Sequence, residues 1–253
     1  MKNLKKLSLL AASALLAVAF LAAGCGSDSA SSGSSSKNTT VTVGATPVPH
    51  GEILNEIKPL LAKEGVDLKV VEFTDYVKPN LALNDKELDA NFFQHSPYLD
   101  KFNSEHGTKL KAIAKIHVEP MGIYSHKIKD LKDLPDGAKV AIPNDPTNGG
   151  RARLILQSAG LIGLKDGGNI TSTVQDVEKN DKHLQFVELE AAQIPRSIDD
   201  VDIALINTNF AMEAGLNPLK DALFLEPIDS PSANVLVIRE GDYNRPEIQK
   251  LVK

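Results

Sequence analysis

The chain has 253 residues, of which 42% are hydrophobic and 24% are charged, as in an ordinary globular protein with a full core. Its 33 acidic side chains outnumber 28 basic ones, so the surface is expected to repel nucleic acid, and no nucleic-acid partner is predicted. A single cysteine excludes disulfides within the chain and any zinc site built from several cysteines.

The first 24 residues have the pattern of a secretory signal peptide. A lysine-rich start is followed by an apolar run over residues 7–23 and by small residues directly before Cys25. We therefore predict that residues 1–24 are a signal peptide that is removed. The alternative is an uncleaved membrane helix, because the apolar run reaches the lower length limit for spanning a bilayer.

Cys25 stands where bacterial lipoproteins receive their lipid. The segment Leu21-Ala-Ala-Gly-Cys25 resembles a lipobox, although Ala22 stands where a larger aliphatic residue is commoner. Several acyl chains on this cysteine, palmitate among them, would anchor the protein stably at the cell membrane, on its extracytoplasmic side. The residues that follow are mostly serine, glycine and alanine, so we predict that residues 25–40 comprise the lipidated cysteine and a flexible tether.

Beyond the tether, strand patterns alternate with helical ones. Apolar residues at helical spacing follow the first strand as far as Gly65, and Pro59 is expected to kink that helix. A second helix is predicted over residues 95–106, and a third begins with Asp145 as N-cap and Pro146 in the first helical position. Extended segments are predicted at 41–45, 68–73, 90–93, 109–118, 138–142, 184–189, 201–206, 223–226 and 233–238.

This alternation predicts an α/β protein with largely parallel sheets. The strands are too many and too evenly spread for one compact sheet. Two lobes are therefore favoured over a single large domain.

Aromatic residues are scarce, yet five of the eight phenylalanines and four tyrosines lie within residues 73–98. Each one taken singly is more often a core residue. Successive strand residues point to opposite faces, so Phe93, which shares a face with Asn91 and His95, is the candidate for a ligand wall, and Phe92 is assigned to the core. An aromatic slot suits a small apolar side chain, and a thioether gains about 0.3–1.5 kcal/mol from each sulfur–aromatic contact.

Arg151 lies in the first two turns of the helix that follows Asp145. A helix N-terminus presents free N–H groups, and a guanidinium beside it would complete a carboxylate site. Because positive charge is unfavourable near a helix start, a compensating anion is expected, and a ligand would serve. The alternative is a surface arginine that pairs with Asp145 or with nothing.

Three asparagines also lie at the ends of predicted strands. Asn207 and Asn209 follow one strand on a shared face, and Asn234 opens another. Their amides can donate to a carboxylate or accept from an ammonium group, although turn and cap roles are the commoner use of asparagine there.

The six histidines show no spacing typical of a metal site, so no metal ligand is predicted, although distant residues could still assemble one. His95 is expected to donate a hydrogen bond in a cleft or to cap its helix. No phosphate-binding loop, dinucleotide fingerprint or nucleophile elbow occurs, and no nucleophile–base pair stands out. The sequence therefore predicts neither an enzyme nor a cofactor.

Six further motifs occur in order along the chain: VVEFTDYVKPN at 70–80, LDANFFQHSPYL at 88–99, PMGIYS at 120–125, VAIPNDPTN at 140–148, DIALINTN at 202–209 and ANVLV at 233–237. With these motifs the chain resembles the methionine-binding lipoproteins of the NlpA family, the substrate-binding components of methionine ABC importers. The resemblance runs from the lipobox to the last residue.

The resemblance implies a ligand site. It places Tyr76, Phe93, His95 and Tyr98 around a methionine side chain. It places Arg151 on the carboxylate and Asn209 and Asn234 at the polar end, with Asn209 preferred to Asn207 and Glu119 only at the cleft edge.

The resemblance also implies an α/β fold of the periplasmic-binding-protein type (type II), with mixed sheets flanked by helices and a cleft between two lobes. Lobe one would comprise residues 41–124 and 232–253, lobe two residues 125–231, with hinges near Tyr124 and Ser232. In such proteins the final helix continues further, so a fragment or a truncated chain is expected.

The implied partners are L-methionine or a close analogue, an ABC permease and the membrane. Both L- and D-methionine are compatible with these residues. The alternatives are a binder of a methionine-containing dipeptide and, less favoured, a metal-binding lipoprotein.

Overall fold

The computed structural model describes residues 38–227 and 232–253. The predicted signal peptide, the lipidation site Cys25 and most of the predicted tether lie outside the described residues. The first strand begins at Thr39, within the range assigned to the tether. None of the helices in the described ranges is both long and apolar enough to cross a bilayer.

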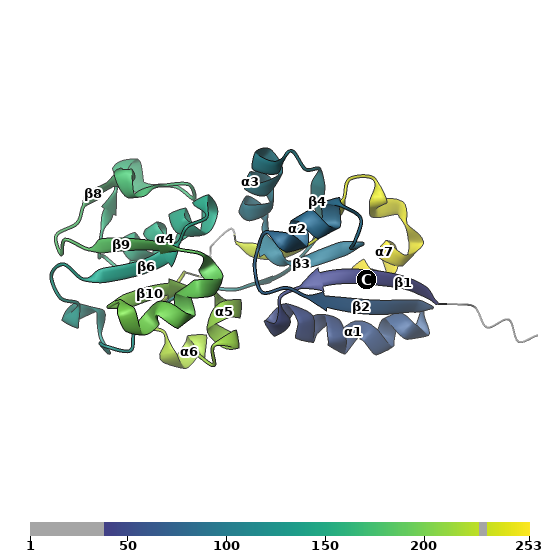
Figure 1. Cartoon of the computed structure of the whole chain (residues 1–253), viewed down its shortest axis with the longest axis horizontal. Helices are drawn as coiled ribbons and strands as arrows, with labels where there is room; N and C mark the ends of the chain where they lie inside the picture. Colours follow the sequence, from purple (N-terminus) through teal and green to yellow (C-terminus); the bar gives the residue numbers. More distant parts are fainter. Residues whose placement is uncertain (1–37, 228–231) are drawn as a thin grey trace, which may run out of the picture. The chain divides into compact units, whose positions relative to one another are not determined.

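Two five-stranded sheets form the framework (Figure 1). The first has the strand order β2-β1-β3-β12-β4 and the second the order β11-β5-β10-β6-β9. The strands of the first are β1 (Thr39–Ala45), β2 (Val66–Glu72), β3 (Ala90–His95), β4 (Leu110–Val118) and β12 (Ala233–Arg239). Those of the second are β5 (Gly122–Tyr124), β6 (Lys139–Pro143), β9 (Gln185–Leu189), β10 (Ile203–Ile206) and β11 (Phe224–Leu225).

Both sheets are mixed. Strands β1, β2 and β3 are parallel to one another, as are β6, β9 and β10. Strands β12, β5 and β11 instead pair antiparallel with their neighbours. The prediction of largely parallel sheets is therefore wrong, because the two connections between the sheets bring strands in from the opposite direction.

The chain crosses between the sheets twice. The first crossing lies between Val118 and Gly122, because β5 pairs with β10 and β11 in the second sheet. This crossing lies a few residues before Tyr124, near which a hinge is predicted. The second crossing lies between Leu225 and Ala233, the range that contains the expected boundary at Ser232.

Helices cover the sheets, and all of the described helices except α6 bury apolar side chains. Helix α1 lies beside β1 and β2 and continues without interruption through Pro59 (Figure 1). Helix α7 buries Ile248 and Leu251 against the same core. The helices are α1 (Glu52–Lys63), α2 (Lys78–Asn84), α3 (Ser96–His106), α4 (Pro146–Ser158), α5 (Thr208–Glu213), α6 (Pro218–Asp221) and α7 (Pro246–Val252). A small ribbon of β7 (Gly163–Leu164) and β8 (Val177–Lys179) follows α4.

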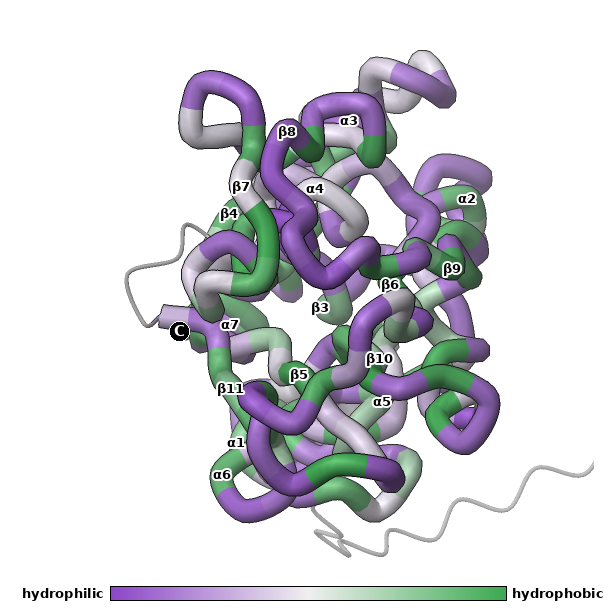
Figure 2. The backbone as a smooth tube through the Cα atoms, turned by 90° about the vertical axis from the view of Figure 1, so that its left-hand side faces the viewer, coloured by the Kyte–Doolittle hydropathy of each residue, from purple (hydrophilic) through white to green (hydrophobic). Residues whose placement is uncertain are grey.

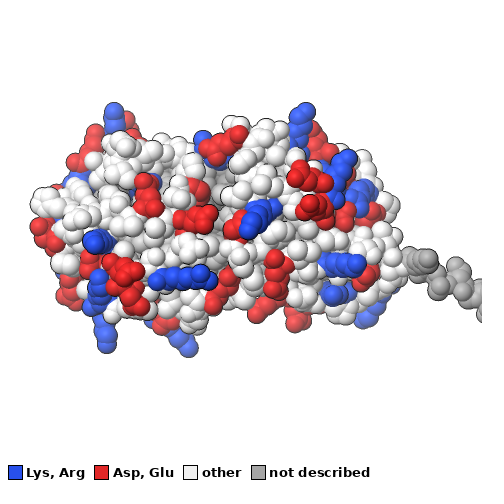
Figure 3. Space-filling view, viewed as in Figure 1, with Lys and Arg blue, Asp and Glu red and all other residues white. Residues whose placement is uncertain are grey.

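Each sheet has its own hydrophobic core. In the first, Val41, Val43 and Phe92 are almost completely buried, and each such side chain contributes about 1.5–3 kcal/mol. In the second, Val140 and Ile155 pack between the sheet and α4. Figure 2 shows hydrophobic segments in the interior and hydrophilic ones in the outer loops. On the face shown in Figure 3, acidic and basic side chains are interspersed.

Two glycines allow the start of α4 to approach its neighbours closely. A Cβ atom on Gly150 would lie 2.1 Å from the carbonyl oxygen of Ile170, and one on Gly149 would lie 2.8 Å from that of Pro143. Only glycine fits such backbone contacts. The two glycines therefore determine the position of the next residue of α4, Arg151.

Candidate functional site

All seven candidate ligand residues line one cavity. The sequence-based candidates around it are Tyr76, Phe93, His95, Tyr98, Arg151, Asn209 and Asn234. Asn207 and Glu119, which the sequence ranked lower, also line it, together with Gln94, Asn148 and Thr208, which the sequence did not select.

Aromatic rings form one wall of the cavity. The ring of Tyr76 lies 5.8 Å from Phe93, 5.9 Å from Tyr98 and 4.8 Å from Phe210. The hydroxyl of Tyr98 donates to the backbone carbonyl of Tyr76 at 2.9 Å, which holds these rings together. As strand alternation predicts, Phe93 lines the cavity, whereas Phe92 packs in the core of the first sheet.

His95 both caps α3 and reaches into the cavity. Its Nδ1 accepts from the backbone N–H of Tyr98 at 3.1 Å, so Nε2 carries the ring proton and donates to Asn148 Oδ1 at 3.1 Å. Burial, reinforced by the nearby Arg151 charge, lowers the pKa of His95 to about 4. His95 is therefore a neutral donor at neutral pH, in both roles that the sequence suggested.

Asn148 connects the two sheets. It lies in the first turn of α4, where the predicted N-cap Asp145 accepts from its backbone N–H at 2.9 Å. The side-chain amide of Asn148 also donates to Asp145, which leaves Oδ1 as an acceptor for His95 and for Asn207 Nδ2. The capping pattern could have indicated Asn148, because the cap orients its side chain.

Arg151 is buried and already has an anionic partner. Its Nε donates to both carboxylate oxygens of Glu226 at 2.9 and 3.0 Å, and Nη2 donates to Glu226 and, at 2.6 Å, to the Glu119 carbonyl. The alternative of a surface arginine paired with Asp145 is therefore wrong. An anion was expected, but no sequence signal pointed to Glu226. These contacts engage Nε and Nη2 and not Nη1.

Two asparagine side chains in the lining each carry a polar atom without a hydrogen bond of normal geometry. Asn209 Oδ1 accepts from the Tyr76 hydroxyl at 2.5 Å, and its Nδ2 has no hydrogen bond of normal geometry within the described residues, although Glu213 lies nearby. Asn207 donates to Asn148 at 2.9 Å, and its buried Oδ1 has no partner there. A donor beside an acceptor matches the carboxylate and ammonium groups of an amino acid.

Comparison with known proteins shows close relatives over the described part of the chain. A family model described as NlpA lipoprotein matches residues 41–253. The D-methionine-binding lipoprotein MetQ of Salmonella typhi is 49% identical over 202 residues, which are 78% of this chain and 74% of that protein.

Solved structures show the same architecture. An ABC transporter periplasmic substrate-binding protein from Coxiella burnetii superimposes with a TM-score of 0.80 at 46% identity, covering 84% of this chain and 90% of that one. A nutrient binding protein from Burkholderia cenocepacia bound to methionine gives a TM-score of 0.80 at 47% identity, with 84% and 90% covered. These likenesses confirm the predicted α/β fold with two mixed sheets.

The lowered pKa of His95 predicts a pH dependence of stability. The unfolded chain binds this proton below pH 6.5 and the folded chain only near pH 4, so the free energy of unfolding should fall as pH decreases between these values. The contribution is at most about 1.4 kcal/mol per pH unit. His95→Asn keeps a capping acceptor but does not titrate, so urea unfolding at several pH values should show a shallower fall.

The matched control is His183→Asn. His183 is exposed, and hydrogen bonding to Asp136 raises its pKa, so its removal should leave the fall in place. Equal slopes for wild type and His95→Asn would contradict the assignment.

Proposed function

Because the chain belongs to the NlpA lipoprotein family, we propose that it captures methionine outside the cytoplasm and delivers it to the permease of an ABC importer. The observation that carries the proposal is a cavity whose lining combines aromatic rings with amide, guanidinium and imidazole groups. The proposed role is binding, with no catalytic step and no cofactor.

The aromatic wall suits the methionine side chain. Tyr76, Phe93 and Tyr98 would surround the thioether, and sulfur–aromatic contacts of about 0.3–1.5 kcal/mol each favour it over an aliphatic chain of equal length. His95 would complete this part of the site as a neutral donor.

The polar wall suits the amino-acid end. Asn209 Nδ2 would donate to the ligand carboxylate, and Asn207 Oδ1 would accept from its ammonium group. Arg151 would place its charge beside the carboxylate while keeping Glu226, and Asn234 lies on the same lining. An amino acid would thus satisfy Asn207 Oδ1, which the described residues leave without a partner, and would share Asn209 Nδ2 with the nearby Glu213.

Closure of two lobes on the ligand explains why both sheets line the cavity. Residues 39–118 with 232–253 would form lobe one and residues 122–227 lobe two, with hinges at the two crossings. Tyr76 with Asn209, and His95 with Asn148, already make hydrogen bonds from one sheet's residues to the other's. A ligand held by both groups favours the closed arrangement over an open one.

Calorimetric titration of ligand-free protein with L-methionine, D-methionine, a methionine-containing dipeptide and leucine tests the function. We expect one equivalent of methionine to bind far more tightly than leucine, because leucine lacks the sulfur. Mass spectrometry of the small molecules that denaturation releases provides a second measurement. If the dipeptide binds more tightly than methionine, the dipeptide is the ligand. If none of these compounds binds, the proposal is rejected.

Arg151→Lys is expected to weaken methionine binding by at least about tenfold, since a lysine keeps the charge but loses the forked geometry of the guanidinium. Arg153→Lys is the matched control. Arg153 lies in the same helix, is buried and pairs with Glu188, but does not line the cavity. Equal affinities of the two variants by calorimetry would remove Arg151 from the binding site.

Cys25→Ala is expected to release the protein from membranes, because the lipid-bearing side chain is lost. Fractionation of cells that express the variant checks this, with Ser34→Ala as a control in the predicted tether. Continued retention of Cys25→Ala in the membrane fraction would instead favour an uncleaved N-terminal helix.

A further inference from the structure

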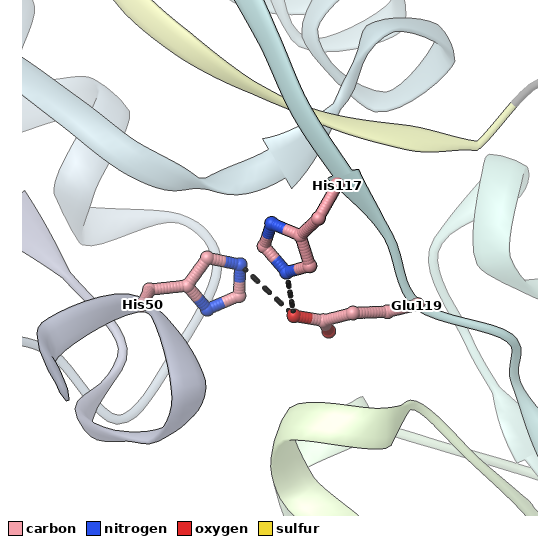
Figure 4. A group of neighbouring side chains, drawn as sticks. All are labelled: His50, His117 and Glu119. Atoms are coloured by element: carbon pink, nitrogen blue, oxygen red, sulfur yellow. Dashed lines mark hydrogen bonds and ion pairs between the residues drawn. The ribbon is translucent and has the colours of Figure 1, made fainter. Parts of the chain in front are cut away.

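A group of three metal-ligating side chains lies beside the cavity. It consists of His50 in the short helical turn η1 (Pro47–Gly51), His117 in β4 and Glu119 just after β4, with one ligating atom of each within 4.8 Å of the others. Figure 4 shows both imidazole rings directed at the same oxygen of Glu119. Within the described residues no other three histidine, cysteine or carboxylate side chains converge in this way.

His50 and Glu119 are shielded from water, His117 is partly exposed, and the hydrogen bonding of both histidines is incomplete. His50 is fully buried and Glu119 is 8% exposed. His50 Nδ1 lies 2.7 Å from the Thr46 hydroxyl, whereas Nε2 has no hydrogen bond of normal geometry within the described residues. His117 Nδ1 is likewise buried without a partner there. Of these two nitrogens, it is His50 Nε2 that faces the Glu119 carboxylate, and a buried nitrogen without a hydrogen bond of normal geometry is uncommon and points to a ligand.

We propose that His50 Nε2, His117 Nε2 and a Glu119 oxygen bind a divalent transition-metal cation, for which zinc is the first candidate. Two imidazoles and one carboxylate are a ligand set that zinc accepts, with a fourth position open to water or another ligand. The dication also neutralises a carboxylate that is largely removed from solvent.

The distances suit such a site. Zinc bonds of about 2.0–2.2 Å place neighbouring tetrahedral ligand atoms about 3.3 Å apart. His50 Nε2 lies 3.3 Å from Glu119 Oε1, which matches this spacing. His117 Nε2 lies 2.6 Å from the same oxygen, a hydrogen-bond distance that must widen when the cation enters. Binding also requires the His117 ring proton to reside on Nδ1.

Surrounding groups hold the ligands in place. Thr46 fixes the His50 ring through Nδ1, the second contact that a metal-bound histidine normally makes. The Phe92 ring lies 4.6 Å from His50 and 5.5 Å from His117, so it packs against both imidazoles. Phe92, which strand alternation assigns to the core, therefore packs against both histidine rings of the proposed metal site.

The test uses protein freed of metal by a chelator and kept free of methionine, so that its result is independent of the proposed ligand. Calorimetric titration with zinc chloride should show one equivalent bound at micromolar concentration or below. Cobalt(II) in place of zinc should give the visible absorption of a tetrahedral site. Failure of both measurements on the wild-type protein would overturn the proposal, whatever methionine does.

Two variants assign the site. Glu119→Gln keeps the shape but is a poor metal ligand, and His117→Gln changes a side chain that is partly exposed, so both are expected to fold, which circular dichroism checks. Each should weaken zinc binding by at least about tenfold. The control is His183→Gln at the exposed pair with Asp136, which should bind zinc like wild type.

Wild-type zinc affinity in a folded Glu119→Gln or His117→Gln variant would overturn the assignment, as would a loss confined to His183→Gln. If one variant does not fold, the other decides.

Discussion

The buried ion pair between Arg151 and Glu226 is the constraint around which the cavity is organised. A guanidinium removed from water requires a compensating anion, and breaking such a pair from one side costs about 3–5 kcal/mol. Glu226 follows β11 at the start of the second crossing, while the Glu119 carbonyl and Met121 N–H, in the first crossing, bond to the same pair. One interaction therefore ties both crossings to helix α4.

This arrangement would allow the proposed site to be stable without a ligand and still accept a ligand carboxylate. Glu226 balances the charge of Arg151, so the cavity does not depend on a ligand to neutralise it. Glu226 accepts hydrogen bonds from Nε and Nη2 of Arg151. A ligand carboxylate would approach Arg151 near the uncharged Nδ2 donor of Asn209. Selectivity for a zwitterion would then depend on the amide side chains, which are neutral and need no counterion before the ligand binds.

Sequence patterns predicted the parts of the site that depend on local rules. Alternation along β3 separated Phe93 from Phe92, and the cap at Asp145 predicted where α4 begins. Glu226 could not be predicted, because its pairing joins residues 75 positions apart and the short strand before it carries no motif. The same limit applies to the sheet that β5 joins: its three residues show no preference for either sheet until β10 and β11 pair with them.

Glu119 occupies the boundary between two chemically different environments. Its backbone carbonyl accepts from Arg151 at the cavity, while its carboxylate faces His50 and His117 on the side of the first sheet. A cation held there would lower the negative potential of this carboxylate at the cavity wall, and removal of the cation would restore it. Because Glu119 also lines the cavity, a cation on its carboxylate would alter the electrostatic free energy of a charged ligand bound there, and the ligand would alter that of the cation equally.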